Sequence, residues 1–275
     1  EISKPRFVLN PDSLLHGCEL VVVDEVSMVG EKIGYDLLSF GKKILVLGDP
    51  GQLPPIEGGG FFTGKEPDFV LTEVHRQAQD SPIINMATLV RQGSTLRFGA
   101  YGQSKVMSRN ELTVADYNAH EQVIVGLNRT RKIVNDEIRD SNNYTGSIPA
   151  TGEKIICLRN NADAGLLNGT QWHVLASEDK GMYLELTVCS LDEPAAKPLE
   201  VNAHHFGLDF ANMPYWDRKQ AEEFDFGYAI TCHKSQGSQW PSVLIRNESY
   251  AFRENSTKWL YTAITRAENQ VTIAV

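Results

Sequence analysis

An apolar run near the start of the chain ends in two adjacent carboxylates. Leu20 to Val23 is continuously apolar and mostly β-branched, and Asp24 and Glu25 follow it directly. Such a run is typical of a strand that is covered on both faces in a parallel α/β sheet, and these sheets bind ligands at the carboxyl ends of their strands. The pair predicts either a nucleotide-hydrolysing site, with one carboxylate on Mg²⁺ and the next on water, or an acidic helix N-terminus.

The rest of the chain alternates strand-like and helical patterns, which predicts an α/β fold with a mostly parallel sheet. Before residue 152, strands are expected at 43–47, 69–73 and 122–126, and helices at 81–91 and 130–139. After residue 207, the pattern predicts strands at 227–232, 242–245 and 270–275, and a helix at 256–266. The intervening segment predicts only short strands, at 155–158, 171–176, 183–188 and 199–203, with hairpin turns at 168–169 and 179–181.

Composition narrows the class of protein. The net charge of -9 argues against a bulk electrostatic attraction to nucleic acid, although a local basic groove remains compatible with it. Neither a membrane-spanning apolar stretch nor a signal peptide is apparent, so no membrane partner is expected. The cysteines form no CxxC pair and are interpreted as reduced core residues of a cytoplasmic protein: Cys18, Cys157, Cys189 and Cys232.

Five motifs occur in a fixed order along the chain. They are VVVDEVSMV at 21–29, LGDPGQLPPI at 47–56, LTEVHRQ at 71–77, AITCHKSQGSQW at 229–240 and YTAITRA at 261–267. Together they resemble superfamily 1 helicases of the 5′-to-3′ branch, the RecD-like and phage Dda-like enzymes. The resemblance spans nearly the whole chain. It implies two RecA-like lobes with a small SH3-like β-barrel inserted in the second.

The resemblance also implies domain boundaries. Residues 1–70 would form the C-terminal part of the first RecA-like lobe, which is incomplete. Residues 71–151 and 208–275 would form the second lobe, and 152–207 the SH3-like barrel.

The same resemblance assigns a site for ATP and Mg²⁺. The residues expected there are Asp24, Glu25, Gln52, Arg76, Gln236, Gly237 and Arg266. Asp24 would hold the metal, Glu25 would be the base for the attacking water, and Gln52 would sense the γ-phosphate. Arg76 and Arg266 resemble arginine fingers, whose planar, always charged guanidinium suits a transferring phosphoryl group. The alternatives are a solvated turn residue for Gln52 and a carboxylate partner at a lobe interface for either arginine.

A second group of residues is expected to bind single-stranded DNA. The HKSQG string follows a predicted strand, and its hydroxyls and ammonium suit backbone phosphates. The residues expected to contact the DNA backbone are Thr231, just before this string, and His233, Lys234 and Ser235 within it. Phe61 and Phe62 would stack on bases if exposed or anchor their loop if buried. By default, three further aromatic residues are interpreted as packing residues: Trp172, Trp216 and Trp240.

A phosphate-binding loop of the form GxxxxGK[ST] is not found. The nearest match, at 59–66, is rejected because Glu66 stands where a hydroxyl must meet Mg²⁺. The chain therefore resembles the C-terminal two-thirds of a helicase. Three explanations of the missing loop remain open. A separate piece of a split enzyme would supply it, or upstream residues that carry it were removed or left out. Alternatively, the chain is a degenerate relative that has lost it.

Two functions follow from these patterns. The first is the motor portion of an ATP-dependent 5′-to-3′ DNA helicase, inactive as this chain alone. The alternative is a non-hydrolysing module that binds single-stranded DNA or a partner protein. Expected partners are single-stranded DNA, replication or recombination proteins, and the missing N-terminal segment as a separate piece. The expected location is the cytoplasm of a bacterial cell or phage-infected host.

Overall fold

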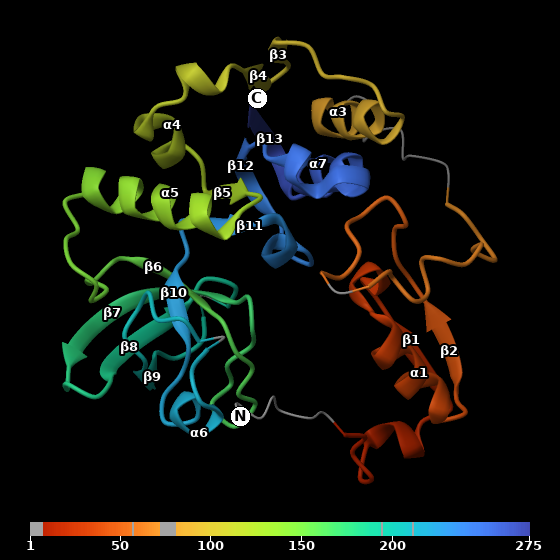
Figure 1. Cartoon of the computed structure of the whole chain (residues 1–275), viewed down its shortest axis with the longest axis horizontal. Helices are drawn as coiled ribbons and strands as arrows, with labels where there is room; N and C mark the ends of the chain where they lie inside the picture. The colour runs from red at the N-terminus through yellow and green to blue at the C-terminus, as the bar shows by residue number, and fades with distance from the viewer. Residues whose placement is uncertain (1–7, 57, 72–80, 194, 211) are drawn as a thin grey trace. The chain divides into compact units, whose positions relative to one another are not determined.

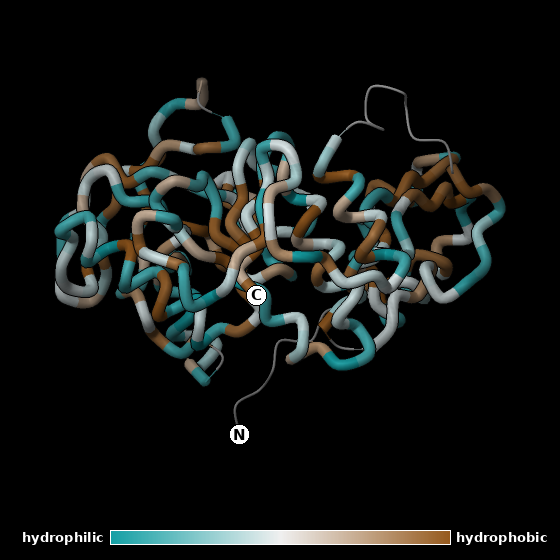
Figure 2. The backbone as a smooth tube through the Cα atoms, turned by 90° about the horizontal axis from the view of Figure 1, so that it is seen from above, coloured by the Kyte–Doolittle hydropathy of each residue, from teal (hydrophilic) through white to brown (hydrophobic). Residues whose placement is uncertain are grey.

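The computed structural model describes residues 8–56, 58–71, 81–193, 195–210 and 212–275 (Figure 1). The described chain forms two compact units. The middle unit is Arg129–Ile230, and the flanking unit consists of residues 8–128 together with Thr231–Val275. Hydrophobic and hydrophilic stretches alternate along the backbone, as its hydropathy colouring shows (Figure 2).

The main sheet has six strands in the order β11-β5-β12-β13-β4-β3. Their bounds are β3 Gly99–Tyr101, β4 Ser104–Met107, β5 Gln122–Val125, β11 Ala229–Thr231, β12 Trp240–Arg246 and β13 Ala267–Ala274. The sheet is mostly parallel, since β12 pairs in parallel with β5 and β13, and β13 with β4. Only the β3–β4 hairpin is antiparallel among the pairings at this end of the sheet. The predicted parallel α/β fold is confirmed.

Two helices pack against this sheet where the sequence signals predict them. Helix α3 (Pro82–Arg91) begins after Ser81 with a proline in its first turn, and Gly93 follows its end at a φ of 78°. Helix α7 (Ser256–Ile264) buries Trp259 completely and packs closely against α3. Two further helices are α4 (Val114–Asn118), which starts with a capping box, and α5 (Asn128–Ser141).

A second, two-stranded parallel sheet is formed by β1 (Leu20–Val23) and β2 (Lys43–Val46), which α1 (Glu31–Ser39) connects. The prediction that 20–23 is buried on both faces is wrong, because Leu20 and Val22 are 51% and 55% exposed. Leu20 pairs with Lys43 and Val22 with Leu45, so these side chains share one face. No layer of described residues covers that face.

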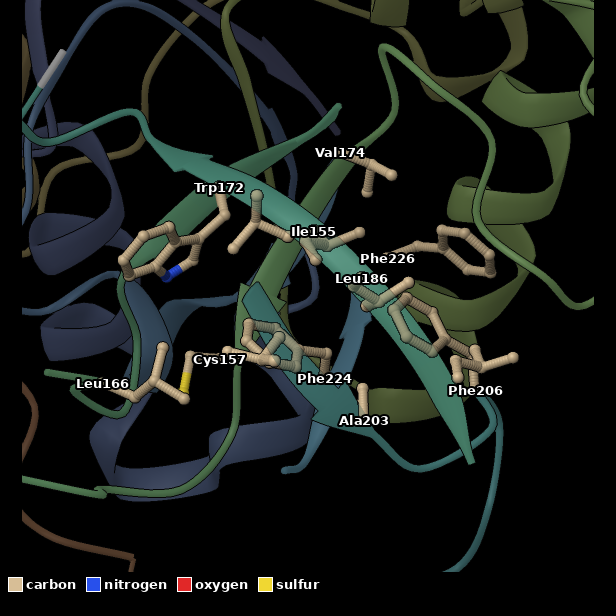
Figure 3. Close-up of a cluster of buried hydrophobic side chains, with 13 residues drawn as sticks. Ile155, Cys157, Leu166, Trp172, Val174, Leu186, Ala203, Phe206, Phe224 and Phe226 are labelled. Carbon is tan, nitrogen blue, oxygen red and sulfur yellow. The ribbon is translucent and has the colours of Figure 1, made fainter. Parts of the chain in front are cut away.

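The middle unit contains a five-stranded antiparallel sheet in the order β10-β6-β7-β8-β9. Its strands are β6 Lys154–Cys157, β7 Gln171–Asp179, β8 Leu184–Ser190, β9 Leu199–Ala203 and β10 Phe224–Phe226. The predicted all-β region is confirmed, and the β7–β8 hairpin turns at Gly181 with a φ of 84°. Strand β10 comes from beyond 207, and its two phenylalanines join the buried core (Figure 3).

Several elements were not expected from the sequence. These are α1, β3, β4, α4, β10 and the short helix α6 (Tyr215–Arg218). The strand expected at 69–73 is absent from 69–71, and its last two residues lie outside the described residues. Trp172 and Trp240 are buried as expected, whereas the packing role for Trp216 is wrong because its side chain is 76% exposed. None of the helices in the described residues is long and apolar enough to cross a membrane.

Candidate functional site

The two carboxylates after β1 lie on a tight turn. Glu25 adopts the left-handed conformation, with φ 49° and ψ 40°, and its backbone N–H donates to the Asp24 carboxylate at 2.8 Å. A non-glycine residue in this conformation is uncommon and is enriched at functional sites. A 3₁₀ turn (Val26–Met28) follows, so the alternative of an α-helix N-terminus directly after the pair is not what forms. Asp24 is exposed and Glu25 half-buried.

The turn is tied to the end of the neighbouring strand. Leu47 N–H donates to the carbonyl of Val23 at 2.8 Å, and Val26 N–H donates to the carbonyl of Leu47 at 3.2 Å. Gly48 follows, and a Cβ at that position would lie 2.6 Å from the Val26 side chain. Glycine is therefore required at 48, where the start of the GDPGQ loop lies close to Val26, the residue after the two carboxylates.

Gln52 is carried by that loop. The Asp49 carboxylate accepts from Gly51 N–H at 2.8 Å, and the Asp49 carbonyl accepts from Gln52 N–H at 3.1 Å, which closes the turn. The side-chain oxygen of Gln52 is buried without a hydrogen-bond partner among the described residues. A solvated turn residue would not leave its amide oxygen in that position, so the buried acceptor fits an absent donor.

Arg266 is 4% exposed and lies between α7 and β13. Its guanidinium donates to the carbonyls of Thr262 and Ser238 and to the Thr265 hydroxyl, each at 3.2 Å. All three partners are neutral, and no described carboxylate forms an ion pair with it. The predicted alternative of a carboxylate partner for Arg266 therefore finds no support in this part of the chain.

Electrostatics link Arg266 to the carboxylate turn. Burial lowers the pKa of Arg266, while the negative charge of Glu25, and more weakly that of Asp49, opposes the shift. Glu25 and Asp49 therefore lie within electrostatic range of Arg266 in the flanking unit. Arg76, the other predicted finger, lies outside the described residues.

The residues of this cluster fit a magnesium–nucleotide. A buried guanidinium with only neutral partners suits an anion, since an uncompensated buried charge is costly. The unpaired oxygen of Gln52 suits a water or metal-bound water, and the exposed carboxylate of Asp24 suits a hydrated cation.

The HKSQG segment follows β11 as a 3₁₀ turn (Cys232–Ser235). Thr231, His233 and Lys234 are half-buried, whereas Ser235 is fully buried and its hydroxyl donates to the Cys232 carbonyl at 2.8 Å. Burial lowers the pKa of His233, and a hydrogen bond with the Pro54 backbone opposes that shift. Of the four predicted DNA contacts, Ser235 is thus engaged inside the protein.

Gln236 and Gly237 complete that segment. Gln236 is 8% exposed and donates to the Leu53 carbonyl at 2.9 Å, while its side-chain oxygen has no partner among the described residues. Gly237 is exposed with a φ of 82°, a conformation that favours glycine. Neither placement tests the predicted nucleotide contacts, which stay predictions.

Phe61 and Phe62 are both half-buried. The Phe61 ring lies directly on Gly34 of α1, where an added Cβ would be 2.1 Å from it, and it packs edge-on against Tyr35 and Phe62. These contacts favour the anchoring alternative for Phe61. Base stacking by Phe62 stays a prediction.

Sequence reasoning missed residues that hold the loop. The Tyr261 hydroxyl of α7 donates to the Asp49 carboxylate at 2.5 Å, and the Thr262 hydroxyl accepts from Leu53 N–H at 2.9 Å. All four residues lie inside the quoted motifs, so the signal was present. Their pairing across more than 200 residues could not be read from spacing.

Comparison with known proteins gives two family matches. Residues 7–111 match the model of an AAA domain, and residues 226–274 match the model of the UvrD-like helicase C-terminal domain. The first contains the carboxylate turn and Gln52, and the second contains the HKSQG segment and Arg266.

Two curated relatives are similar over nearly the whole chain. An ATP-dependent RecD2 DNA helicase of Deinococcus radiodurans is 25% identical, over 92% of this chain and 36% of the relative. An ATP-dependent DNA helicase Pif1 of Campylobacter jejuni is 25% identical, over 95% of this chain and 70% of the relative. The chain thus spans about a third of the RecD2 relative and over two-thirds of the Pif1 relative.

A solved structure shares the fold. Bacteroides Pif1 bound to single-stranded DNA aligns with a TM-score of 0.59 at 16% identity, over 98% of this chain and 75% of that protein. The chain is similar to RecD- and Pif1-like superfamily 1 helicases, as its motifs predicted, and its mixed α/β architecture with parallel sheets matches their RecA-like fold.

Proposed function

We propose that this RecD- and Pif1-like chain is the motor portion of an ATP-dependent DNA helicase that moves 5′-to-3′ on single-stranded DNA. The observation that carries the proposal is the state of the Arg266 guanidinium. It is buried, its hydrogen-bond partners are neutral, and the negative charge of Glu25 acts on it. A structural arginine would be expected to pair with a carboxylate. An arginine that binds a phosphoryl group would be expected to have neutral protein partners, as Arg266 has.

In the proposed reaction, a bound magnesium–ATP supplies the phosphoanhydride bond whose hydrolysis releases free energy. Asp24 would hold the metal, which would supply positive charge to the phosphates, and a Glu25 carboxylate oxygen would accept the proton of the attacking water. Gln52 orients that water with its side-chain oxygen and donates from its amide nitrogen to the terminal phosphate. Arg266 neutralises the charge that develops on the phosphate, and Arg76 is proposed to assist it.

Single-stranded DNA is the proposed track. Thr231, His233 and Lys234 would hold its backbone, and the fold shared with Bacteroides Pif1 bound to single-stranded DNA supports this. The direction of movement rests on the family resemblance. The antiparallel sheet of the middle unit, to which residues 152–207 contribute four of the five strands, supports the proposed SH3-like barrel inserted in the second lobe.

The proposal also requires a phosphate-binding loop, because none of the 275 residues forms a GxxxxGK[ST] motif. The exposed apolar face of β1 and β2 offers a surface on which the structure that bears this loop could pack. Parallel sheets are normally covered on both faces, and a two-stranded sheet rarely stands alone. We propose that further α/β structure bearing the loop packs on this face and completes the first lobe, so that this chain alone does not hydrolyse ATP.

The test is Glu25→Gln in the complete protein that carries this chain and a phosphate loop. We expect ATP hydrolysis stimulated by single-stranded DNA to fall at least 100-fold, because loss of a general base costs about 10²–10⁴ in rate. ATP affinity should change less than threefold, because the amide keeps the shape of the side chain.

Glu31→Gln is the matched control, since it removes an exposed carboxylate six positions away at the start of α1. It should leave turnover unchanged. Full hydrolysis by Glu25→Gln would refute the assigned base. A wild-type protein that binds single-stranded DNA without hydrolysing ATP would instead support a non-hydrolysing module.

A further inference from the structure

The loop that carries Gln52 is held on both sides by consecutive residues of α7. The Tyr261 hydroxyl donates to the Asp49 carboxylate at 2.5 Å, three positions before Gln52. The Thr262 hydroxyl accepts from Leu53 N–H at 2.9 Å, one position after it. Arg266 comes two residues after the end of helix α7, so these contacts come from the element that also positions the predicted finger.

The HKSQG segment also contacts the loop, at Leu53. Gln236 donates to the Leu53 carbonyl at 2.9 Å, so both backbone polar groups of Leu53 are bonded to residues from the C-terminal part of the chain. Leu53 is 1% exposed. The backbone of this residue is therefore fixed, together with its buried side chain.

The Asp49 side has little room for movement. Asp49 also accepts from Gly51 N–H, and a Cβ at Gly51 would lie 3.1 Å from the Asp49 carboxylate and 3.3 Å from the Tyr261 ring. Arg91 adds an ion pair to Asp49 at 3.7 Å. Burial, and then Asp49, raise the pKa of Tyr261 to about 12, so its hydroxyl stays a donor at neutral pH.

This arrangement leaves the Gln52 side chain incompletely bonded. The side-chain oxygen of Gln52 is buried and unbonded among the described residues, although the backbone on either side of it is fixed. A buried acceptor without a partner costs about 1–3 kcal/mol, so its presence calls for an explanation such as a bound water or ligand. The loop is thus built to present this oxygen rather than to satisfy it.

We propose that Tyr261 and Thr262 are positioning residues, which set the Gln52 amide against the reacting nucleotide and transmit its occupancy through Leu53 and Gln236 to the DNA-binding segment. The inference rests on the proposed function, because it needs a nucleotide at Gln52. Both hydroxyls would act through the loop, because their bonds are to Asp49 and Leu53.

The test compares two variants at one position. Thr262→Val keeps the shape of this fully buried side chain but removes the acceptor, and Thr262→Ser keeps the hydroxyl. Hydrogen exchange of the Leu53 amide, measured on the 275-residue chain, should accelerate about tenfold in Thr262→Val and less than twofold in Thr262→Ser. Thr257→Val, an exposed threonine of the same helix, is the control and should change nothing.

The second readout is steady-state ATP hydrolysis by the complete protein. Thr262→Val should lower kcat about tenfold with KM changed less than twofold, because a misplaced Gln52 affects the reacting state more than binding. Thr262→Ser should restore kcat. Unchanged Leu53 exchange in Thr262→Val would overturn the inference, and so would faster exchange with an unchanged kcat.

A second variant covers the case in which Thr262→Val does not fold. Tyr261→Phe removes only the hydroxyl, and it should accelerate exchange at Gly51 and Gln52 and lower kcat, whereas Tyr250→Phe at an exposed site should not. If wild-type protein hydrolyses no ATP, the proposed function fails and the inference falls with it. If wild-type protein hydrolyses ATP but neither variant lowers kcat, only the inference fails.

Discussion

At the scale of single residues, Glu25 illustrates what a sequence can and cannot specify. Its position after an apolar run was enough to identify it as a candidate base. Its left-handed backbone was not predictable, because glutamate seldom adopts that conformation. The conformation persists because hydrogen bonds from Val26 to Leu47 and from Glu25 to Asp24 hold the turn. Local strain of this kind depends on contacts between residues far apart in the sequence, such as Val26 and Leu47, and these cannot be predicted from a local sequence pattern.

The buried cysteines give a prediction at the same scale. Burial raises the pKa of Cys232 to about 12, so only about one molecule in 10⁴ carries the thiolate at pH 8. In native protein at pH 8, a thiol reagent should modify the half-buried Cys18 and Cys189 first. Cys157 and Cys232, which are fully buried, should react only after unfolding.

Mass spectrometry of tryptic peptides over time measures this order. Modification of Cys232 as rapidly as Cys189 in the folded chain would show that the segment before His233 opens readily. It would also contradict the fixed arrangement of the HKSQG turn.

At the scale of elements, the strand and helix patterns located the core but not its limits. The helix expected at 81–91 forms with the predicted stop, and the strand at 20–23 forms with the predicted bounds. Burial of β1 on both faces was wrong, because pattern reasoning assumes that covering layers are present. Strand β10 was missed because Phe224–Phe226 is too short to show a period. Such elements form only because an existing sheet offers them an edge.

An ion pair that sequence patterns did not reveal joins helix α5 to Glu153, the residue before strand β6. Arg139 donates twice to the Glu153 carboxylate, at 2.7 and 3.1 Å, and the two side chains are 7% and 0% exposed. The guanidinium also stacks on Phe226, 3.7 Å from the ring centre. Loss of one member would leave the other charged and buried.

We therefore expect Arg139→Met to lower the free energy of unfolding of the middle unit by about 3–5 kcal/mol. Urea unfolding followed by Trp172 fluorescence measures this, because Trp172 lies in the core of that unit. Arg129→Met, an exposed arginine of the same helix, is the control and should cost less than about 0.5 kcal/mol. Equal losses in the two variants would show that the buried pair does not stabilise the unit.

At the scale of the whole molecule, the order of five motifs carried more information than any single element. Residues from the two ends of the sequence meet in the flanking unit, where the charge of Glu25 acts on Arg266 and where Tyr261 and Thr262 bond the Gln52 loop. That convergence followed from the resemblance and not from periodicity or spacing. The contacts of Tyr261 and Thr262 with the Gln52 loop required the structure, since motif order does not say which hydroxyl faces which backbone group.

The central claim is that nucleotide bound near Glu25, Gln52 and Arg266 changes the affinity of the protein for single-stranded DNA. The direct measurement is the affinity of the complete protein for a fluorescent oligothymidine, without nucleotide and with a saturating non-hydrolysable ATP analogue. We expect at least a fivefold difference, a coupling of about 1 kcal/mol, and its loss in Gln52→Ala. Equal DNA affinities in the two states, with the analogue shown to be bound, would contradict the account.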